Sequence, residues 1–466
     1  MEVVRRLSNG QSESSDANSD LEVILPTTHS SPNGGSSWWV SVLIVVNAAM
    51  GAGMLNFPSA FAAAGGVFWG MVVHAFLVVA ATGSILALGA VADGPQTPTQ
   101  IPILQDNDRQ LSYSQSYQET IKRVCGKGWG SVVSAVIAIY MYLASITYLV
   151  VVGDETDRIF YDHKGEDFCR HWYLNRRFII GLGSLLFVWP LIYPKKIDFL
   201  KYASGAATIG IAYIIAIVVY MYFKLDTSNV AIRTRPAHFT DIFNTIPAIC
   251  FSYQCHVSSI PIYACISPHK LSAFAKTVST AMALCFLSYS TIGILGYLTF
   301  GDATQPDILS SYDTRHWPVA LGFLLFAIKN LLTVPILLFW MMGEGSGRAA
   351  ERRRVVLVTV SFLAVVLLAV FLPDISIVID YLGCLAACFI FLFPGLALLV
   401  ASGKAEMGWS TKEQKLALVA ACFFLVFGAL VFGITISQGL ESMGQKARQP
   451  LCKLTDSLLL GYSILQ

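Results

Sequence analysis

Residues 47–58, NAAMGAGMLNFP, lie inside a long apolar run where a membrane-spanning helix is expected. Gly51, Ala52 and Gly53 stand in the middle of this run. Each Gly costs about 1 kcal/mol relative to Ala in a helix interior, so two within three residues can open the helix. Alternatively, the small residues let a neighbouring helix pack closely, as small-xxx-small patterns do. This stretch alone leaves both interpretations open.

The rest of the chain has the composition of a membrane protein. Of its 466 residues, 55% are hydrophobic and 13% are charged, and the mean hydropathy is +0.62. Apolar runs recur about eleven times, each long enough to cross a hydrocarbon core of about 30 Å as a helix. We therefore predict an all-α integral membrane protein with about eleven transmembrane helices. The expected spans are residues 38–62, 66–91, 131–153, 178–194, 203–223, 242–266, 278–300, 317–341, 355–372, 375–400 and 416–439.

The two ends of the chain are predicted to lie on opposite sides of the membrane. Residues 1–37 are rich in Ser, Asn, Gly and Asp without apolar periodicity, which predicts a disordered tail. Lys and Arg gather in alternate loops, which favours a cytosolic N-terminus. An odd number of crossings then places residues 441–466 in the lumen or outside the cell, after a transmembrane domain of residues 38–440. Cys169 and Cys452 both fall on that side, but their spacing alone does not predict a disulfide.

The sixth expected span carries a second interruption. Its residues 244–266 read NTIPAICFSYQCHVSSIPIYACI, with Pro247 and Pro261 on either side of a polar stretch. Polar residues at mid-depth are costly unless they face partners or a cavity. Interrupted helices in corresponding positions of two five-span halves indicate an inverted-repeat secondary transporter with its substrate at the membrane midplane. The candidate substrate-binding residues are Ala49, Gly51, Ala52, Gly53, Phe251, Ser252, Tyr253, Gln254 and His256.

The chemistry of opened half-helices points to a zwitterion. Their exposed N–H groups suit a carboxylate, and their exposed carbonyl groups suit an ammonium or a sodium ion. An α-amino acid fits both ends, although another small polar solute remains open. A net charge of +2 gives no indication of nucleic-acid binding. We find no catalytic constellation and predict that the chain is not an enzyme.

Five motifs identify a family resemblance. They are NAAMGAGMLNFPSAFAAAGG at 47–66, VVGDETDRI at 151–159, IPAICFSYQCHVSSIPIY at 246–263, GYLTFGD at 296–302 and ACFIFLFPGLAL at 387–398. With these motifs in order, the chain resembles the sodium-coupled neutral amino acid transporter family of the amino acid/auxin permease group. QCHVSS is most similar to a lysosomal branch that carries glutamine and asparagine, and a second branch is a near rival. The resemblance implies a five-plus-five inverted repeat with one extra helix, and movement of amino acids into the cytosol with sodium.

The resemblance also implies a sodium site and an altered pocket. Asn47 and Thr333 match residues of the family that are held to contribute to sodium binding, although a Thr in a membrane helix often bonds its own preceding turn. Ser252 and Tyr253 stand where the family has Gly and Phe, so they add two hydroxyls to the expected pocket. His256 matches the family's histidine and is either hydrogen-bonded within the structure or a proton sensor.

Two further side chains in the spans need an interpretation. We expect His74 to be hydrogen-bonded inside the bundle rather than to act as a ligand. Lys329 lies one turn before Thr333, so its ammonium is a candidate surrogate for the sodium ion. Alternatively, Lys329 pairs with Asp380 or extends outward to the membrane surface.

The N-terminal tail suggests a compartment. In DLEVIL, residues 20–25, Asp20 precedes Ile24 and Leu25 in the spacing of an acidic dileucine signal that cytosolic adaptors read. We therefore predict the lysosomal membrane, with the plasma membrane as the alternative. The expected partners are neutral amino acids, sodium as the coupling ion, the lipid bilayer and sorting adaptors, with no other cofactor. An amino-acid sensor and a sodium-independent, proton-linked transporter remain alternative functions.

Overall fold

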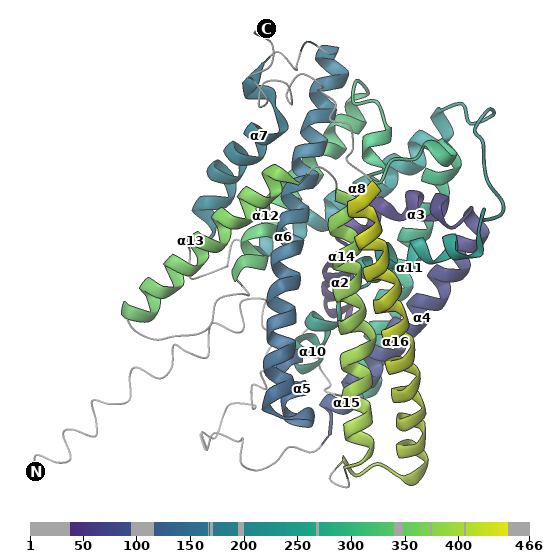
Figure 1. Cartoon of the computed structure of the whole chain (residues 1–466), viewed down its shortest axis with the longest axis vertical. Coiled ribbons are helices and arrows are strands. Elements are labelled where there is room, and N and C mark those ends of the chain that lie inside the picture. Colours follow the sequence, from purple (N-terminus) through teal and green to yellow (C-terminus); the bar gives the residue numbers. More distant parts are fainter. Residues whose placement is uncertain are drawn as a thin grey trace, which may run out of the picture.

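The computed structural model describes residues 38–94, 116–165, 167, 171–193, 200–266, 270–339, 348–372, 375–404 and 407–445. Most of these residues are helical, and the helices form one elongated bundle (Figure 1). α5 (Tyr117–Cys125) and α15 (Phe393–Ser402) lie toward one end of this bundle, and α7 (Arg176–Gly183) lies toward the other. The predicted all-helical fold is confirmed.

The first five expected spans correspond to α2 (Trp38–Ala49), η1 (Ala52–Asn56), α3 (Phe57–Ala63), α4 (Val67–Ala92), α6 (Lys127–Lys164), α7, η5 (Ser184–Val188), η6 (Trp189–Leu191) and α8 (Leu200–Lys224), with η4 (Trp172–Leu174) before α7. The remaining six correspond to η7 (Phe239–Thr245), α9 (Ile246–Ser252), α10 (His256–Cys265), α11 (Leu271–Phe300), α12 (Trp317–Phe339), α13 (Arg348–Phe371), α14 (Ile375–Ala387), η10 (Cys388–Leu392), α15 and α16 (Thr411–Gln445), with η8 (Gly301–Ala303) and η9 (Leu309–Ser311) before α12. Of these elements, η5 and η10 are π-helical turns.

Apolar length accounts for most of the spans. Within the described residues, seven helices are long and apolar enough to cross a membrane, and α2 with η1 and α3 forms an eighth span that is bent by 59°. The three other expected spans correspond to two interrupted segments, α7–η6 and α9–α10, and to α8, of which Thr208–Lys224 forms an apolar helix. The predicted set of about eleven spans therefore agrees with the structure.

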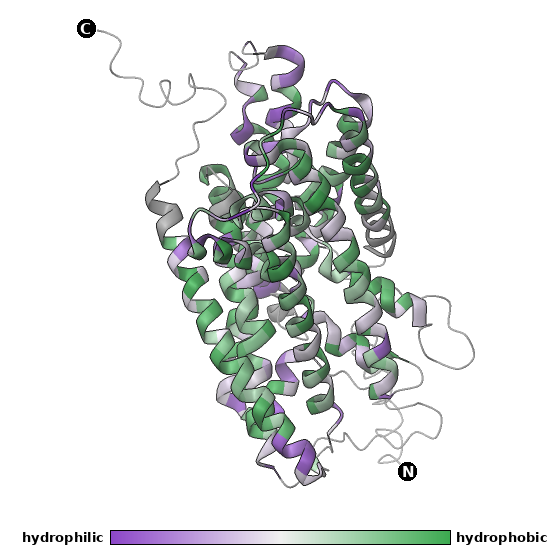
Figure 2. Cartoon of the chain, turned by 90° about the vertical axis from the view of Figure 1, so that its right-hand side faces the viewer, coloured by the Kyte–Doolittle hydropathy of each residue, from purple (hydrophilic) through white to green (hydrophobic). Residues whose placement is uncertain are grey.

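The spans differ in how deeply they are buried. In the apolar window of Val378–Ser402, 72% of residues are buried, and in that of α6 67% are buried. The corresponding shares for α13 and α16 are only 22% and 28%. Hydrophobic residues dominate the middle of the bundle, and hydrophilic residues gather toward its two ends (Figure 2). α6 and α14–α15 therefore form the centre, whereas α13 and α16 present apolar side chains to lipid.

The third span continues beyond its apolar part. Its predicted end was residue 153, but α6 runs to Lys164 and stops before Gly165, whose φ is +61°. The added turns are anchored by ion pairs and hydrogen bonds: Arg176 Nε lies 2.7 Å from Asp154 Oδ1, and Asp162 accepts the Thr314 backbone N–H. Hydropathy alone could not indicate this end, because polar contacts rather than lipid stabilise it.

Candidate functional site

The first span is interrupted directly after Ala49. α2 ends there, Gly51 is extended with φ −112° and ψ −158°, and the chain resumes as η1 at Ala52. Met50 N–H still bonds the Val46 carbonyl, and Gly51 N–H bonds the Ala49 carbonyl at 2.9 Å in a tight turn. The predicted discontinuity is confirmed.

The sixth span is interrupted between Ser252 and His256. α9 ends at Ser252, Tyr253–Cys255 are not helical, and α10 begins at His256. Pro247 lies in the first turn of α9, where its missing N–H leaves no helical bond unmade. Pro261 lies inside α10. The break therefore lies between the two prolines rather than at either of them.

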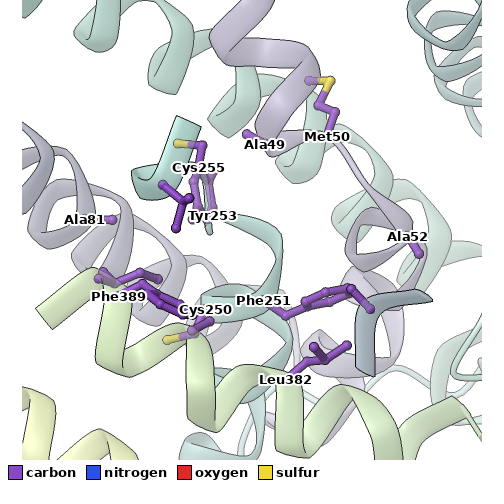
Figure 3. Packing of buried hydrophobic residues seen from close by; sticks show 14 of the residues in the cluster. Ala49, Met50, Ala52, Ala81, Cys250, Phe251, Tyr253, Cys255, Leu382 and Phe389 are labelled. Atoms are coloured by element: carbon purple, nitrogen blue, oxygen red, sulfur yellow. The ribbon is translucent and has the colours of Figure 1, made fainter. Parts of the chain in front are cut away.

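The two interruptions touch each other. A Cβ placed on Gly53 would lie 2.3 Å from Ser252 Oγ and 3.0 Å from Phe251 Cδ1, and one on Gly51 would lie 2.9 Å from Tyr148 Oη. Figure 3 shows Ala49, Met50 and Ala52 of the first break in one view with Phe251, Tyr253 and Cys255 of the second. Both interpretations of the glycines hold: the helix opens here, and the glycines allow the close approach of neighbouring elements.

Tyr289 on α11 connects the two breaks. Its hydroxyl lies 2.9 Å from the carbonyl oxygen of Ala49 and 3.1 Å from that of Ser252, which are the last residues of α2 and α9. Because a hydroxyl carries one proton, the two carbonyls share a single donor. Sequence reasoning missed this residue, and its signal in the sequence is a Tyr between Ser288 and Ser290 in the seventh expected span.

The two extra hydroxyls, on Ser252 and Tyr253, are engaged within the protein. Ser252 Oγ donates to the Ala248 carbonyl at 2.7 Å, and Tyr253 Oη lies 2.7 Å from His74 Nε2. The other nitrogen of His74 lies 3.4 Å from Ser290 Oγ. His74 is thus fully buried and hydrogen-bonded, as expected.

The polar residues that follow the second break differ in how they are bonded. His256 is fully buried, and its Nε2 lies 2.8 Å from Ser84 Oγ, which itself donates to the Ala81 carbonyl. His256 Nε2–H is therefore the donor toward Ser84, and this contact agrees with the hydrogen-bonded interpretation of the histidine. Gln254 is buried with no hydrogen-bond partner for its Nε2 among the described residues. Its Nε2 group can therefore donate to a solute at the break.

The predicted sodium residues lie on different helices and are not joined directly. Thr208 on α8 donates to Asn47 Oδ1 at 3.5 Å, and Thr333 Oγ1 donates to the Lys329 carbonyl at 2.8 Å. No hydrogen bond of the described residues joins Asn47 to Thr333. The bond of Thr333 to its own preceding turn uses its proton, whereas its oxygen lone pairs can still face a cation.

Lys329 is buried and does not reach the membrane surface. Its side chain is 7% exposed, and its ammonium lies over the rings of Tyr148 at 5.1 Å and Phe326 at 5.0 Å. The ion pairs of the described residues include none between Lys329 and Asp380, and the charge that acts on Lys329 is that of Glu155. The structure therefore supports neither alternative for this lysine. The sorting residues Asp20, Ile24 and Leu25, together with Cys169 and Cys452, lie outside the described residues.

Comparisons with known proteins agree with this architecture. The family model described as transmembrane amino acid transporter protein matches residues 34–438. Sodium-coupled neutral amino acid transporter 7 of Danio rerio is 35% identical over 434 residues, covering 89% of this chain and 90% of the relative. The Homo sapiens protein of the same name is 36% identical over 426 residues, covering 87% and 88%. Solute carrier family 38 member 8 of Homo sapiens is 30% identical over 399 residues, covering 79% and 86%.

A solved structure shares the fold. The crystal structure of MhsT in complex with L-phenylalanine superposes with a TM-score of 0.56 at 14% sequence identity, covering 87% of this chain and 100% of that chain. At this identity the likeness concerns the fold alone.

Proposed function

Because the chain belongs to the transmembrane amino acid transporter family, we propose that it is a sodium-coupled symporter of neutral polar amino acids, chiefly L-glutamine and L-asparagine. Transport is directed into the cytosol, out of the lysosome. The names of the relatives support sodium coupling and neutral substrates. The similarity of QCHVSS to a lysosomal branch supports the two amides and the compartment.

One observation carries this proposal: the two helix interruptions meet, and their carbonyl ends converge on Tyr289. The carbonyls of Ala49 and Ser252 suit an ammonium group, which has three N–H donors in place of the single donor of Tyr289. The N-terminus of α10 begins beyond the second break at His256, and its dipole suits a carboxylate. Gln254 adds a buried amide that can recognise the side-chain amide of glutamine or asparagine. A zwitterion with an amide side chain satisfies all three groups.

Sodium is proposed to bind beside the substrate. Asn47 supplies a neutral amide oxygen one turn before the break, and Thr333 supplies a hydroxyl oxygen on α12. The ammonium of Lys329 is the competing candidate for this role. It lies over the ring of Tyr148, whose hydroxyl interacts with the backbone of Ala52, so this ring separates the ammonium from the break. We therefore favour a sodium ion over the lysine at this place.

The direction and the compartment rest on the loops and the tail. Lys122 and Arg123 on α5 lie on the side that the loop charges assign to the cytosol. Asp20, Ile24 and Leu25 then lie in a cytosolic tail where adaptors can read them. Replacing Ile24 and Leu25 with Ala should move a tagged protein to the cell surface, and an unchanged location would remove this argument.

Flux separates the proposed transporter from a sensor with the same fold. In proteoliposomes, a transporter takes up radiolabelled glutamine saturably under an inward sodium gradient. A sensor would show a glutamine-dependent rise of the thermal unfolding midpoint in the same preparation but no uptake. Accumulated glutamine that is lost when the gradient is collapsed would support the proposal.

A further inference from the structure

The outer surface of α7 carries an apolar groove with a cation at one end. We call it the α7 groove; its volume is about 360 Å³. Its lining consists of Arg177, Phe178, Gly181, Leu182 and Leu185, which lie on α7 and the first turn of η5. Leu182 and Leu185 are 44% and 59% exposed, so the groove is open to the outside of the bundle. It is separate from α2, η1, α9 and α10, which form the candidate substrate site.

Gly181 creates the hollow because it has no side chain. Arg177, Gly181 and Leu185 are spaced by four residues, so they lie along one stripe of the helix. A glycine in a membrane helix commonly lets another helix approach closely. Here a Cβ on Gly181 would meet nothing within 4 Å among the described residues. The stripe is therefore not used for packing within the described bundle, and a flexible molecule can occupy it.

The surroundings of the groove are those of a lipid contact. α7 packs beside α13 on one flank of the bundle (Figure 1), and only 22% of the apolar window of α13 is buried. Arg177 directly precedes the expected span 178–194, which places it at the boundary between membrane and water. Trp172 is 73% exposed, and its ring centroid lies 4.9 Å from that of Phe178. Exposed Trp side chains gather at this boundary, so the groove runs from the interface into the hydrocarbon.

Two successive arginines at this boundary have different partners. Arg176 is paired with Asp154 at 2.7 Å and also donates to the Leu372 carbonyl at 3.0 Å. The guanidinium of Arg177 lies 6.0 Å from the ring centroid of Phe371 at the end of α13, and no ion pair of the described residues includes it. Arg177 therefore presents an uncompensated positive charge at the head of an apolar groove. A guanidinium in this position suits a phosphate group.

We propose that the α7 groove binds an anionic phospholipid, with its phosphate at Arg177 and one acyl chain along Gly181 and Leu185. A phospholipid carries both the negative group and the hydrocarbon chain in one molecule, in the order in which the groove presents their partners. No carboxylate lines the groove, so nothing there receives the ammonium group of a zwitterionic lipid. The bound lipid would also cover Arg177 and Phe371, where α7 meets the end of α13. This inference goes beyond the proposed function and does not depend on transport.

Photo-crosslinking tests the charge requirement at the site itself. The full chain is reconstituted in phosphatidylcholine vesicles that contain phosphatidylglycerol with a photoreactive acyl chain, and labelled peptides are identified by mass spectrometry. We expect label within residues 176–188 and about fivefold less of it in Arg177→Gln, because one cation near the surface contributes about 1 kcal/mol to binding of anionic lipid. Arg235→Gln removes an exposed arginine outside the groove and should label like the wild type. Equal labelling in Arg177→Gln, or by photoreactive phosphatidylcholine with the same chains, would overturn the proposal.

Two glycine variants test the place of the acyl chain. Gly181→Leu fills the groove, and Gly183→Leu adds the same side chain to the same helix outside the groove. A Cβ meets nothing within 4 Å at either position, so both variants should fold. We expect the label to be lost in Gly181→Leu and retained in Gly183→Leu. Equal labelling of the two variants would contradict the proposal, as would copies of Leu185→Cys that crosslink to each other, because a second copy of the chain would then occupy the groove.

Discussion

The hydroxyl of Tyr289 donates to the carbonyl oxygen of Ala49 across 2.9 Å, and this contact holds the end of the first half-helix against α11. The same hydroxyl lies 3.1 Å from the carbonyl of Ser252, at the end of the corresponding half-helix in the second repeat. One donor thus serves two carbonyls that helix formation leaves free. An arriving ammonium group can satisfy both carbonyls at once, so Tyr289 and the substrate compete for the same acceptors.

Replacing Tyr289 with Phe should therefore affect the substrate-free protein most. We expect a loss of about 1 kcal/mol in stability without substrate, the net contribution of one hydrogen bond. Because the ammonium replaces the lost donor, the rise of the thermal midpoint with glutamine should be larger than in the wild type. Tyr297→Phe on the same helix, which loses contacts to the Arg233 backbone instead, should leave that rise unchanged. An equal rise in all three proteins would show that Tyr289 is not at the substrate site.

The close contact of the two breaks predicts a severe effect of Gly53→Ala. The added Cβ would lie 2.3 Å from Ser252 Oγ and 3.1 Å from Ser252 Cα, so the two interruptions must move apart. Overpacking of this kind costs typically about 1–3 kcal/mol, and we expect uptake to fall below a tenth of the wild type. Gly433→Ala on α16, where a Cβ meets nothing within 4 Å, is the matched control. Normal uptake and stability in Gly53→Ala would contradict the described contact.

The sodium proposal predicts that two side chains set the sodium affinity. Asn47→Ala and Thr333→Val should each raise the half-saturating sodium concentration by about tenfold, which corresponds to about 1.4 kcal/mol. Thr291→Val on α11 is the control. The Thr291 hydroxyl donates to a carbonyl of its own preceding turn, as that of Thr333 does, but Thr291 lies on the exposed face of its helix. Its sodium curve should match the wild type. If Thr333→Val behaves like Thr291→Val, the hydroxyl of Thr333 is only an internal helix contact.

Glu155 and Lys329 are both buried and charged, so the effects of substituting them on stability should be coupled. Lys329→Met should lower stability by about 1–3 kcal/mol, because it leaves the buried carboxylate without the positive charge that acts on it. Adding Glu155→Gln to Lys329→Met should recover most of the lost stability, as measured by thermal unfolding. Such a departure from additivity in a double-mutant cycle indicates that the two groups interact. Additive losses would show that the two charges do not interact. A steep sodium requirement that persists in the double variant would exclude Lys329 as a surrogate for the ion.

The fold was predictable because it depends on signals that the sequence carries locally. The lengths of the apolar runs predicted the transmembrane spans. The interruptions were indicated by Gly51 and Gly53 in the first span and by the polar residues 252–256 in the sixth. The end of α6 at Lys164 was not predictable, since ion pairs with residues far along the chain stabilise its polar turns. α5 was also missed. It docks on the bundle through a hydrogen bond from Tyr117 to the Phe389 carbonyl.

The partners within the site depend on tertiary packing that no local pattern records. Tyr289 is one tyrosine among several in apolar spans, and only the folded bundle places its hydroxyl between two distant carbonyls. Similarly, Asp380 was the sequence-based partner for Lys329, whereas the packing of α6 against α12 brings Glu155 within its field. Sequence reasoning therefore identified the positions of the breaks but not the side chains that connect them.

The central claim is that the two meeting interruptions form the substrate site of a sodium-coupled transporter. Its most direct test is the uptake of radiolabelled glutamine into proteoliposomes, with the sodium gradient and the pH gradient imposed independently. The account predicts concentrative uptake whenever sodium is inward-directed, reduced below a tenth of the wild type in Gly53→Ala but not in Gly433→Ala. Concentrative uptake driven by the pH gradient alone, with no effect of sodium, would contradict it.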